Sequence, residues 1–360
     1  MRRGTCTCEQ VSDGHPDKLC DQIADAIVTE ILRHDRKARA AIECLIKDRT
    51  IVLAGEVRSS WEPDYRALVT DVFQRIGWGN LGYDMSDPEV ILKIGRQSPD
   101  ISAGVDRGGA GDQGVMCGYA TDETPELLPI PFVLATRFLE ELKAYRGTGS
   151  WALHEDAKAQ VAFDYERERI ASFLCSVHHS PEVSAEDIRP IVSGLMHKAA
   201  LGCGYGQDFR KIVNPAGAFT IGGPFADCGV TGRKLACDTY GGVGCSVSGA
   251  LSGKDPTKVD RSAAYMARKI ACDIVLGGMA HECTVQLAYA IGMREPMSVS
   301  VDLHGTGSIS PKDAEAFARC AYDLTPEGII RKLGLLDVDY NLVSAYGHFG
   351  KPGLPWEAEE

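Results

Sequence analysis

The stretch Arg39 to Arg58, "RAAIECLIKDRTIVLAGEVR", decides the fold class. Its two halves are rich in β-branched and other apolar residues, and a polar pair, Asp48-Arg49, separates them. This pattern predicts an antiparallel hairpin with strands over 39–47 and 50–58. Helices are predicted on either side of the hairpin, over 16–34 and 63–77, and a further strand over 89–95. We therefore expect this part of the chain to form an α+β unit.

The helix predicted over 16–34 has a clear apolar face, since Leu19, Ile23, Ile27 and Ile31 recur at helical spacing. Pro16 suits its first turn. Ser12 or Asp13 is available as the residue that caps its N-terminus.

Two more α+β units are predicted beyond a Gly- and Asp-rich stretch, 97–114, which we interpret as a long functional loop. The second unit has a helix near 130–146, strands near 158–165 and 171–178, and a helix near 184–199. The third has a helix near 258–276, strands near 283–291 and 297–303, and short helices up to about residue 334. No Pro/Ser-rich linker separates the units, so we expect them to pack tightly.

Composition narrows the possible partners of this chain of 360 residues, of which 44% are hydrophobic and 24% charged. A formal net charge of -12 opposes binding to nucleic acids or to anionic membranes, because both would be repelled. No stretch approaches the roughly 18 continuous apolar residues of a spanning helix, and the N-terminus has no apolar signal region. The 13 cysteines are scattered and never spaced as C-x-x-C, so we expect reduced thiols and a cytoplasmic protein.

Two glycine-rich stretches resemble nucleotide-binding motifs only in part. Residues 109–114, "GAGDQG", satisfy G-x-G-x-x-G, but no predicted strand runs directly into them, so we reject a Rossmann interpretation. Residues 241–249, "GGVGCSVSG", lack the G-K-S/T ending of a P-loop.

The segment 12–18, "SDGHPDK", gathers a histidine, two carboxylates and a lysine before the first helix. Further cations lie beside glycine-rich turns, and together with this segment they fit a polyphosphate site. The cations are Lys18, Arg233, Lys234, Lys254 and Lys258. Asp17 and Asp260, in the same segments, would fit Mg²⁺. For the segment alone, a capped helix with a hydrogen-bonded histidine is an equally good interpretation.

The ordered motifs of the chain resemble those of the S-adenosylmethionine synthetase (methionine adenosyltransferase) family. They are "SDGHPDK" (12–18), "GEV" (55–57), "GRQSPDI" (95–101), "GAGDQG" (109–114), "GYATDET" (118–124), "DAKAQV" (156–161), "IGGP" (221–224), "DCGVTGRK" (227–234), "DTYGG" (238–242), "GKDPTKVDRSAAY" (253–265) and "AYGHFG" (345–350). These blocks cover essentially the whole chain.

The resemblance implies an α+β fold of three similar α/β-sandwich-like domains around a pseudo-threefold axis. We place the domains at 1–100, 101–225 and 226–360, with a gating loop near 100–112. It also implies a homodimer with active sites at the subunit interface, or a homotetramer. In the family's reaction, methionine sulfur attacks C5′ of ATP, and the released tripolyphosphate is hydrolysed to pyrophosphate and phosphate. An in-line displacement of this kind depends mainly on alignment and on stabilising the charged leaving group.

The resemblance also implies roles for individual residues. His15, Lys158, Arg233 and Lys254 would be catalytic. The ATP site would comprise His15, Lys18, Asp112, Lys158, Phe219, Arg233, Lys234 and Lys254, with Asp112 at the ribose and Phe219 stacked on adenine. Methionine would be bound by Glu56, Gln97, Asp227 and Lys258. Asp17 and Asp260 would each bind one of two Mg²⁺ ions, and Glu43 would bind K⁺.

Three features depart from the family pattern. Ala218 stands where the family has an arginine before Phe219, residues 246–251 replace a glycine-rich run, and the loop before "GAGDQG" is shorter. An active synthetase is the leading interpretation. The alternatives are a weakly active homologue that acts as a regulatory or binding subunit or uses another nucleotide or thioether, and an enzyme limited to tripolyphosphate hydrolysis.

Overall fold

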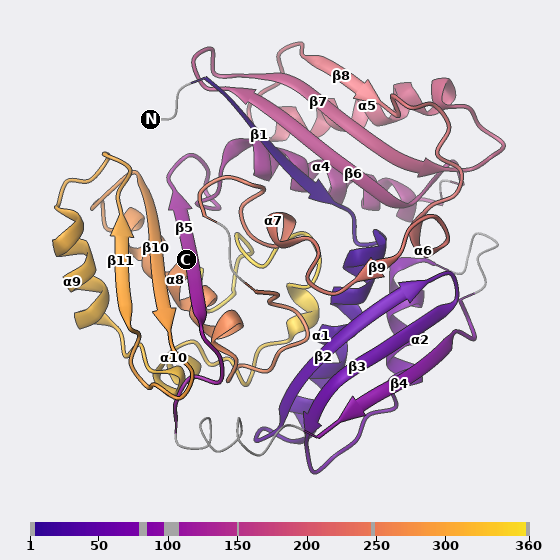
Figure 1. Cartoon of the computed structure of the whole chain (residues 1–360). Helices are drawn as coiled ribbons and strands as arrows, with labels where there is room; N and C mark the ends of the chain where they lie inside the picture. The colour runs from indigo at the N-terminus through magenta and orange to yellow at the C-terminus, as the bar shows by residue number, and fades with distance from the viewer. Residues whose placement is uncertain (1–3, 79–84, 97–107, 150, 246–248, 358–360) are drawn as a thin grey trace.

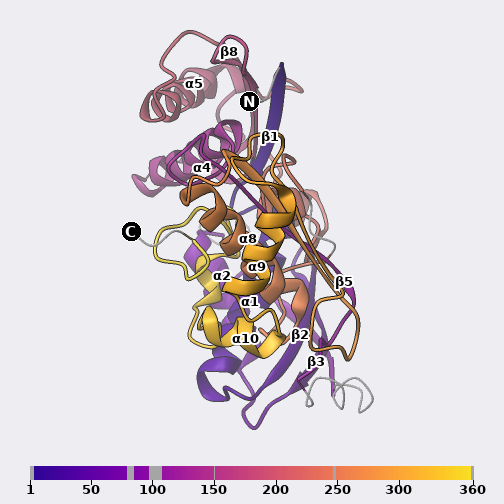
Figure 2. The ribbon, with the colours of Figure 1, turned by 90° about the vertical axis from the view of Figure 1, so that its left-hand side faces the viewer.

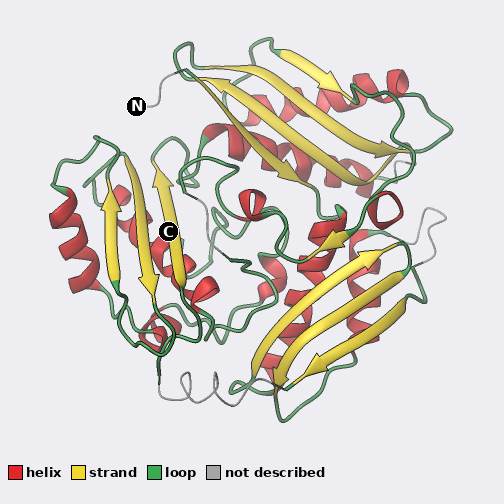
Figure 3. Cartoon of the chain, viewed as in Figure 1, coloured by secondary structure: helices red, strands yellow, loops and turns green. Residues whose placement is uncertain are grey.

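The computed structural model describes residues 4–78, 85–96, 108–149, 151–245 and 249–357. Three small β-sheets surround a common centre, and all three face the viewer in Figure 1 with helices behind them (Figure 1). Turning the molecule by 90° shows the strands gathered toward one side and the helices toward the other (Figure 2). The molecule is therefore a layer of three sheets backed by a layer of helices, as Figure 3 shows by secondary structure.

The first sheet has the strand order β4-β3-β2-β9. Its strands are β2 (Arg39–Lys47), β3 (Thr50–Arg58), β4 (Glu89–Gly95) and the short β9 (Gly229–Val230). The predicted hairpin is confirmed, because β2 and β3 pair antiparallel from Arg39↔Arg58 to Lys47↔Thr50 and Asp48 turns with φ 54°. Helices α1 (Pro16–His34) and α2 (Tyr65–Ile76) pack together, and α1 packs against β2.

The second sheet has the order β1-β6-β7-β8. It consists of β1 (Thr5–Val11), β6 (Leu153–Asp164), β7 (Arg169–His179) and β8 (Arg210–Val213). Helix α4 (Ile130–Gly147) packs against β6 and β1, and α5 (Ala185–Gly202) packs against α4. Their shared apolar residues form a core separate from that of the other two sheets.

The third sheet has the order β11-β10-β5. Its strands are β5 (Gly114–Thr121), β10 (Glu282–Tyr289) and β11 (Ser298–Asp302), backed by α8 (Val259–Leu276), α9 (Pro311–Ala321) and α10 (Pro326–Lys332). Gly118 allows β5 to lie directly on α8, since a Cβ there would come within 2.0 Å of the backbone carbon of Ala267. Short helices α6 (Gly223–Ala226) and α7 (Leu235–Asp238) and a 3-10 turn at Tyr340–Leu342 complete the fold.

Each sheet takes a strand from another part of the chain. β1 pairs with β6, β5 pairs with β10, and β9 pairs with β2. The chain is α+β with three sheet units, as predicted, but these units exchange strands. The boundaries at 100/101 and 225/226 stay a prediction, because strands on either side of them contribute to the same sheets.

The helices of the first unit follow the sequence pattern closely, but the predicted cap was wrong. His15, rather than Ser12 or Asp13, occupies the N-cap of α1, and its Nδ1 accepts the backbone N–H of Asp17 at 3.1 Å. Ser12 is used elsewhere, since its hydroxyl donates to the carbonyl of Glu155 at 2.6 Å. Asp13 instead pairs with Lys143 at 2.7 Å.

No helix within the described ranges combines the length and the apolar character that a membrane crossing requires. All 13 cysteines are free thiols, as predicted.

Candidate active site

A stripe of three aspartates on α1 organises the polar centre of the molecule. Asp17, Asp21 and Asp25 are spaced four residues apart, so they lie on one face of the helix. Each accepts a backbone N–H from a distant loop: Asp17 from Val230, Asp21 from Gly232 and Asp25 from Gly253, all at 2.9 Å. The helix thereby holds the 230–232 and 253 segments in place.

Each aspartate of the stripe also forms an ion pair with a basic side chain. Lys234 lies 2.5 Å from Asp17, Lys18 lies 2.9 Å from Asp21, and Arg261 lies 2.5 Å from Asp25. The inner two pairs are sealed inside the fold, whereas the Lys234 side chain is 20% exposed. The outer end of the stripe is therefore where a ligand can approach.

His15 lies at this outer end and is held in one tautomer. Because Nδ1 accepts the Asp17 N–H, the proton of the neutral ring is assigned to Nε2. Burial first, and then the charges of Lys234, Lys158, Lys18 and Arg233, lower the pKa of His15 to about 2. The imidazole is thus a neutral hydrogen-bond donor among cations.

A first group of predicted site residues comes together here: His15, Asp17, Lys158, Arg233 and Lys234. Arg233 is half-exposed, 3.8 Å from Asp17, and Lys158 is exposed at the start of the pairing between β6 and β1. Convergent cations around a donor histidine can bind an anion with several charged oxygens.

Asp156 lies beside this group and was not predicted. Its Oδ2 accepts the Gly223 N–H at 2.8 Å, and its buried Oδ1 has no hydrogen-bond partner. Burial raises its pKa to about 6, and the charges of Asp227 and Asp17 add to this shift, while Lys158 opposes it. A buried carboxylate oxygen without a partner, close to two further carboxylates, marks a place where a cation would be stabilised.

A second group of predicted residues lies at the exposed face of the first sheet and at the segment that leads into α8: Glu43, Glu56, Lys254, Lys258 and Asp260. Lys254 pairs with Asp260 at 2.5 Å, and its backbone bridges to Ala41, which lies opposite Glu56 in the β2–β3 register. Burial raises the pKa of Glu43, Lys254 opposes the shift, and Glu56 adds to it. Lys258 is the N-cap residue of α8, two positions before Asp260.

The two groups are distinct within one chain. No hydrogen bond or ion pair between described residues joins the first group to the second. The first lies at Asp17 and the second near Gly253, which is held by Asp25, so eight residues of helix, about 12 Å, separate their anchors.

Phe219 is fixed by a histidine rather than by a charged neighbour. Its N–H donates to Nε2 of His179 at 3.0 Å, and its carbonyl accepts the His179 N–H at 2.9 Å. The His178 ring lies 5.6 Å from the Phe219 ring, with Trp78 stacked beyond it at 6.0 Å. Ala218 is exposed next to this aromatic set.

Besides Phe219, three predicted site residues in the described ranges belong to neither group: Asp227, Lys18 and Asp112. Asp227 is exposed, its Oδ1 accepts the N–H of Cys228 at 2.8 Å, and its charge reaches Asp156 beside the first group. Lys18 is 1% exposed and its Nζ contacts Asp238 at 2.5 Å as well as Asp21, so it points into the fold and not toward the other phosphate-site cations. Asp112 is exposed and accepts the N–H of its neighbour Gln113. Gln97 and most of the predicted gating loop, 100–107, lie outside the described residues.

Sequence reasoning missed Asp21, Asp25, Asp156 and His179. The four-residue spacing of the aspartates, on a helix with a clear apolar face, was a usable signal, because charged residues on a buried helix need partners. His179 had no comparable signal in the sequence.

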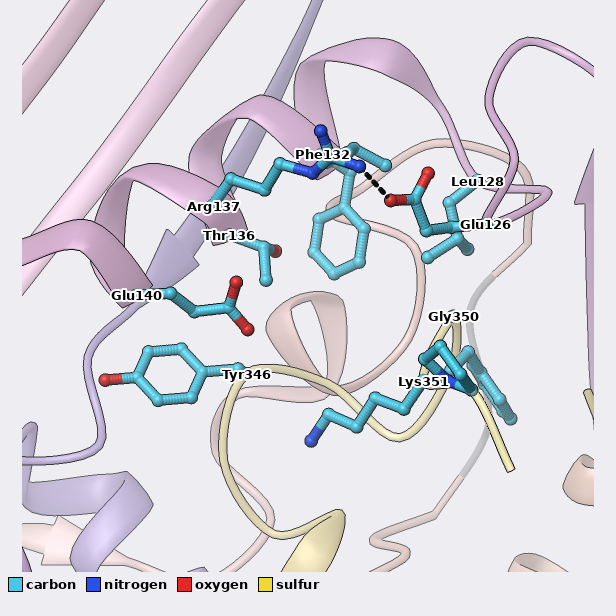
Figure 4. Close-up of a pocket in the computed structure, with 12 residues that line it drawn as sticks. Glu126, Leu128, Phe132, Thr136, Arg137, Glu140, Tyr346, Gly350 and Lys351 are labelled. Atoms are coloured by element: carbon cyan, nitrogen blue, oxygen red, sulfur yellow. Dashed lines mark hydrogen bonds and ion pairs between the residues drawn. The ribbon is translucent and has the colours of Figure 1, made fainter. Parts of the chain in front are cut away.

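Another hollow lies between α4 and the C-terminal segment, with a volume of about 210 Å³ (Figure 4). An ion pair between Arg137 and Glu126, at 2.5 Å, crosses one side of it. Lys351 reaches past it to donate to the carbonyls of Leu342 and Ala345 at 2.7 and 2.6 Å. None of the predicted site residues lines this hollow.

Comparisons with known proteins agree along the whole chain. Three family models match in order: the N-terminal domain of S-adenosylmethionine synthetase over residues 3–99, the central domain over 107–219, and the C-terminal domain over 221–358. The S-adenosylmethionine synthase of Sorangium cellulosum is 44% identical over 372 residues, covering 99% of this chain and 88% of that protein. The S-adenosylmethionine synthase of Desulfosudis oleivorans is 42% identical over 368 residues, covering 98% and 95%.

Proposed function

The chain belongs to the S-adenosylmethionine synthetase family, and we propose that it makes S-adenosylmethionine from ATP and L-methionine at the two charged groups described above. It is a methionine adenosyltransferase: the sulfur of methionine attacks C5′ of ATP and the tripolyphosphate leaves. The enzyme then hydrolyses the tripolyphosphate to pyrophosphate and phosphate.

The environment of His15 carries this proposal. A neutral imidazole with its proton on Nε2 can donate a hydrogen bond to the oxygen that departs from C5′, where negative charge develops in the transition state. Lys158, Arg233 and Lys234 lie close enough to His15 to lower its pKa, so they are positioned to bind the phosphate chain. A cationic imidazole is not required, because these three side chains supply the positive charge.

The carboxylates fit the Mg²⁺ ions that the family implies. Mg²⁺ is commonly bound by one or two carboxylates together with phosphate oxygens of the substrate. The buried Oδ1 of Asp156, without a partner near Asp17, supports a cation at this end of α1. Asp17 and Asp260 would each hold one Mg²⁺, which when bound neutralises phosphate oxygens.

We further propose that a second copy of the chain completes each site. The phosphate-binding group with His15 would come from one subunit, and the group of Glu43, Glu56, Lys254 and Asp260 from its partner. The separation of about 12 Å between the two groups along α1 supports this arrangement. Glu43 and Glu56 lie on an exposed face of the first sheet, where a partner can reach them. The resulting assembly would be a homodimer or homotetramer.

Other assignments follow from the same proposal. Methionine would be held by Glu56, Gln97, Asp227 and Lys258, with carboxylates facing its amino group and cations facing its carboxylate. Asp112 would contact the ribose, Phe219 would stack on adenine, and K⁺ would lie at Glu43. For Lys18 we propose a positioning role, since it already neutralises Asp21 and Asp238.

Reduced thiols throughout are in keeping with a cytoplasmic location.

A product-resolved assay tests the function. The purified chain is incubated with ATP, methionine, Mg²⁺ and K⁺, and S-adenosylmethionine, pyrophosphate and phosphate are followed together. We expect equal amounts of all three products, and we expect no S-adenosylmethionine when methionine is omitted. Phosphate without S-adenosylmethionine would contradict the proposal and favour an isolated tripolyphosphatase.

The His15 assignment is tested by His15→Asn, whose amide can still accept the Asp17 N–H but is too short to place a donor where Nε2 of the imidazole lies. Loss of a donor to a transition-state oxygen should lower kcat by roughly 10²–10³ with ATP binding retained. Unchanged kcat would remove His15 from the reaction.

A further inference from the structure

A hollow lined by basic side chains lies outside both groups of the candidate active site. It has a volume of about 510 Å³ and opens where the end of α1 meets α10 and the segment before β5. Arg36 and Lys37 follow α1, Arg39 begins β2, and Arg294 lies in the turn between β10 and β11. No residue proposed above for catalysis or for binding ATP, methionine or a metal is among the described residues that line it.

Three of these four cations have no carboxylate partner. Arg36 is neutralised, because its guanidinium donates to both carboxylate oxygens of Asp337, at 2.5 and 3.0 Å. Between described residues, by contrast, no ion pair involves the side chain of Lys37, Arg39 or Arg294. A bound anion can therefore contact these three without displacing an internal partner.

The hollow is positive although the chain as a whole is acidic. Glu327 is the one acidic side chain among its described lining residues, so three unpaired cations against one carboxylate leave an excess of two positive charges. The formal net charge of the whole chain is -12. Cations gathered in one place repel one another, and a bound anion removes this repulsion. The hollow therefore favours an anion with more than one negative charge.

Arg39 offers hydrogen-bond donors that the fold leaves unused. Its Nη1 donates to the carbonyls of Lys37 and Ala38, both at 3.1 Å. Its Nε is buried and has no hydrogen-bond partner in the described part of the chain. A guanidinium carries its N–H donors in a planar fork that matches the geometry of phosphate oxygens. Phosphate oxygens in the hollow are therefore suitable acceptors for this side chain.

Arg294 is held in position by the backbone around it. The Ala110 N–H donates to the carbonyl of Met293, and the Gly292 N–H donates to the carbonyl of Ala110, both at 2.7 Å. Gly108 lies against the Arg294 side chain, since a Cβ at residue 108 would come within 3.5 Å of its Nε. The cation is therefore placed at the wall of the hollow before any ligand binds.

Apolar side chains make up another part of the wall. Pro326 and Ile330 of α10, and Leu336 beyond it, line the hollow together with the cations. The volume of the hollow lies within the range of roughly 300–1,000 Å³ that is usual for small-molecule sites. The hollow therefore has room for an organic group next to the phosphates.

The proposed second copy of the chain leaves this hollow accessible. That copy is expected at the exposed face of the first sheet, where Glu43 and Glu56 lie. The side chains of Arg36 and Lys37 are exposed at the end of α1, and α1 and α10 belong to the helix layer behind the sheets (Figure 2). We therefore expect a ligand to approach from the helix side in the assembly.

We propose that the hollow binds an anion with a diphosphate or triphosphate group. Phosphate oxygens accept hydrogen bonds from Arg39 and Arg294, and Lys37 adds a further positive charge. Binding is non-covalent, and it requires neither turnover nor the Mg²⁺ ions of the proposed active site. The phosphate group can come from free inorganic pyrophosphate or from a nucleotide, and the experiment separates these two sources.

Calorimetric titration of the purified chain with pyrophosphate, without Mg²⁺, tests the site. Under these conditions the lysines of the candidate active site keep their ion pairs with Asp17 and Asp260, whereas the cations of the hollow are free. We expect saturable binding of one pyrophosphate per chain. Arg39→Gln and Arg294→Gln should each weaken binding by roughly tenfold or more, because each removes a charge-assisted hydrogen bond.

Matched variants separate this site from the rest of the molecule. Arg189→Gln removes an exposed arginine of α5 that pairs with Glu186 at 3.4 Å, and pyrophosphate binding should stay unchanged. Arg233→Gln removes a half-exposed cation of the first group, and it too should leave Mg²⁺-free binding unchanged. Because Arg294 forms no ion pair between described residues, Arg294→Gln should keep the melting temperature of the unaltered chain.

The same titration with ADP identifies the source of the phosphate group. An affinity for ADP no higher than that for pyrophosphate would support a site for the phosphates alone. An affinity for ADP that is roughly tenfold higher would support a nucleotide site that uses the apolar wall.

Two results would overturn the proposal: no binding of either anion, or binding that Arg233→Gln abolishes and Arg294→Gln does not. The titration involves no formation of S-adenosylmethionine. Its outcome is therefore independent of whether the proposed function holds.

Discussion

Replacing Lys18 by methionine distinguishes a buried positioning residue from a phosphate ligand. Lys18 is 1% exposed, and its Nζ lies 2.9 Å from Asp21 and 2.5 Å from Asp238. Removing one partner of a buried ion pair typically costs about 3–5 kcal/mol, because the remaining charge is left without compensation. Here two carboxylates would be left facing each other, so we expect the free energy of unfolding to fall by at least this amount, about 3–5 kcal/mol.

Urea denaturation measures the loss, with a surface ion pair as the matched control. Lys198 pairs with Glu141 at 2.6 Å, but the two side chains are 66% and 30% exposed. Lys198→Met should therefore cost only about 0–1 kcal/mol. Adding Asp238→Asn to Lys18→Met should restore part of the stability, because one of the two uncompensated charges is removed.

The pH dependence of the Lys18→Met variant follows from Asp21. Burial first, with a contribution from Asp238, raises the pKa of Asp21 to about 7 even though Lys18 opposes the shift. Without Lys18 this pKa rises further. A carboxyl group whose folded pKa lies above its unfolded value supports the fold at low pH and loses that support as pH rises through the folded pKa. The deficit of the variant should therefore be larger at pH 8 than at pH 5.

The reasoning would be refuted by the opposite result. If Lys18→Met changes the free energy of unfolding by less than about 1 kcal/mol but raises KM for ATP tenfold or more, Lys18 contacts phosphate and the buried pairing is not what holds the site together.

Three further changes test single contacts. Ala218→Arg should raise kcat/KM for ATP by up to roughly 10²–10³-fold, because it adds a cation next to Phe219; a fall would mean that another cation already fills this space. His179→Phe should raise KM for ATP roughly tenfold with kcat nearly unchanged, since the Phe219 N–H loses its acceptor, and His179→Gln should recover much of the loss. Asp156→Asn keeps an acceptor for the Gly223 N–H but removes a carboxyl group whose pKa rises from 3.8 to about 6 in the folded state. The free energy of unfolding of the variant should therefore no longer fall between those pH values, and at pH 7 it should exceed that of the unaltered chain by up to roughly 3 kcal/mol. An unchanged pH profile in urea unfolding would contradict the assignment.

Elements with a strong local pattern were predictable from the sequence. The hairpin of β2 and β3 and the helix α1 begin and end at the predicted residues, because alternation, helical spacing and a two-residue polar turn are local signals. β1, β5 and β9 were not predicted as strands. Their partners lie far away in the chain, so no short-range pattern indicates that β1 pairs with β6 or β9 with β2.

The site could be predicted as a set of residues but not as an arrangement. The motifs named His15, Asp17, Arg233 and Lys234, and the structure brings these four together. The sequence could not indicate that Lys18, one residue from Asp17, turns inward, because this depends on Asp238, which lies 220 residues further along the chain. Burial of a charged side chain is decided by such distant partners, and a motif does not contain them.

The contacts of the two proposed metal ligands suggest how the site tolerates so much charge before substrate binds. Asp17 pairs with Lys234, and Asp260 pairs with Lys254, so each proposed Mg²⁺ ligand is neutralised by a proposed phosphate ligand. A complex of Mg²⁺ with a polyphosphate carries both signs of charge. It can therefore take the place of each internal partner, with the metal at the carboxylate and phosphate oxygens at the lysine. Neither the empty nor the loaded site then contains a buried charge without a partner of opposite sign. Such an unpaired charge would cost about 3–5 kcal/mol, as in a broken buried ion pair. The pairing of opposite roles in each ion pair thus lets one site be stable when empty and still bind a highly charged substrate.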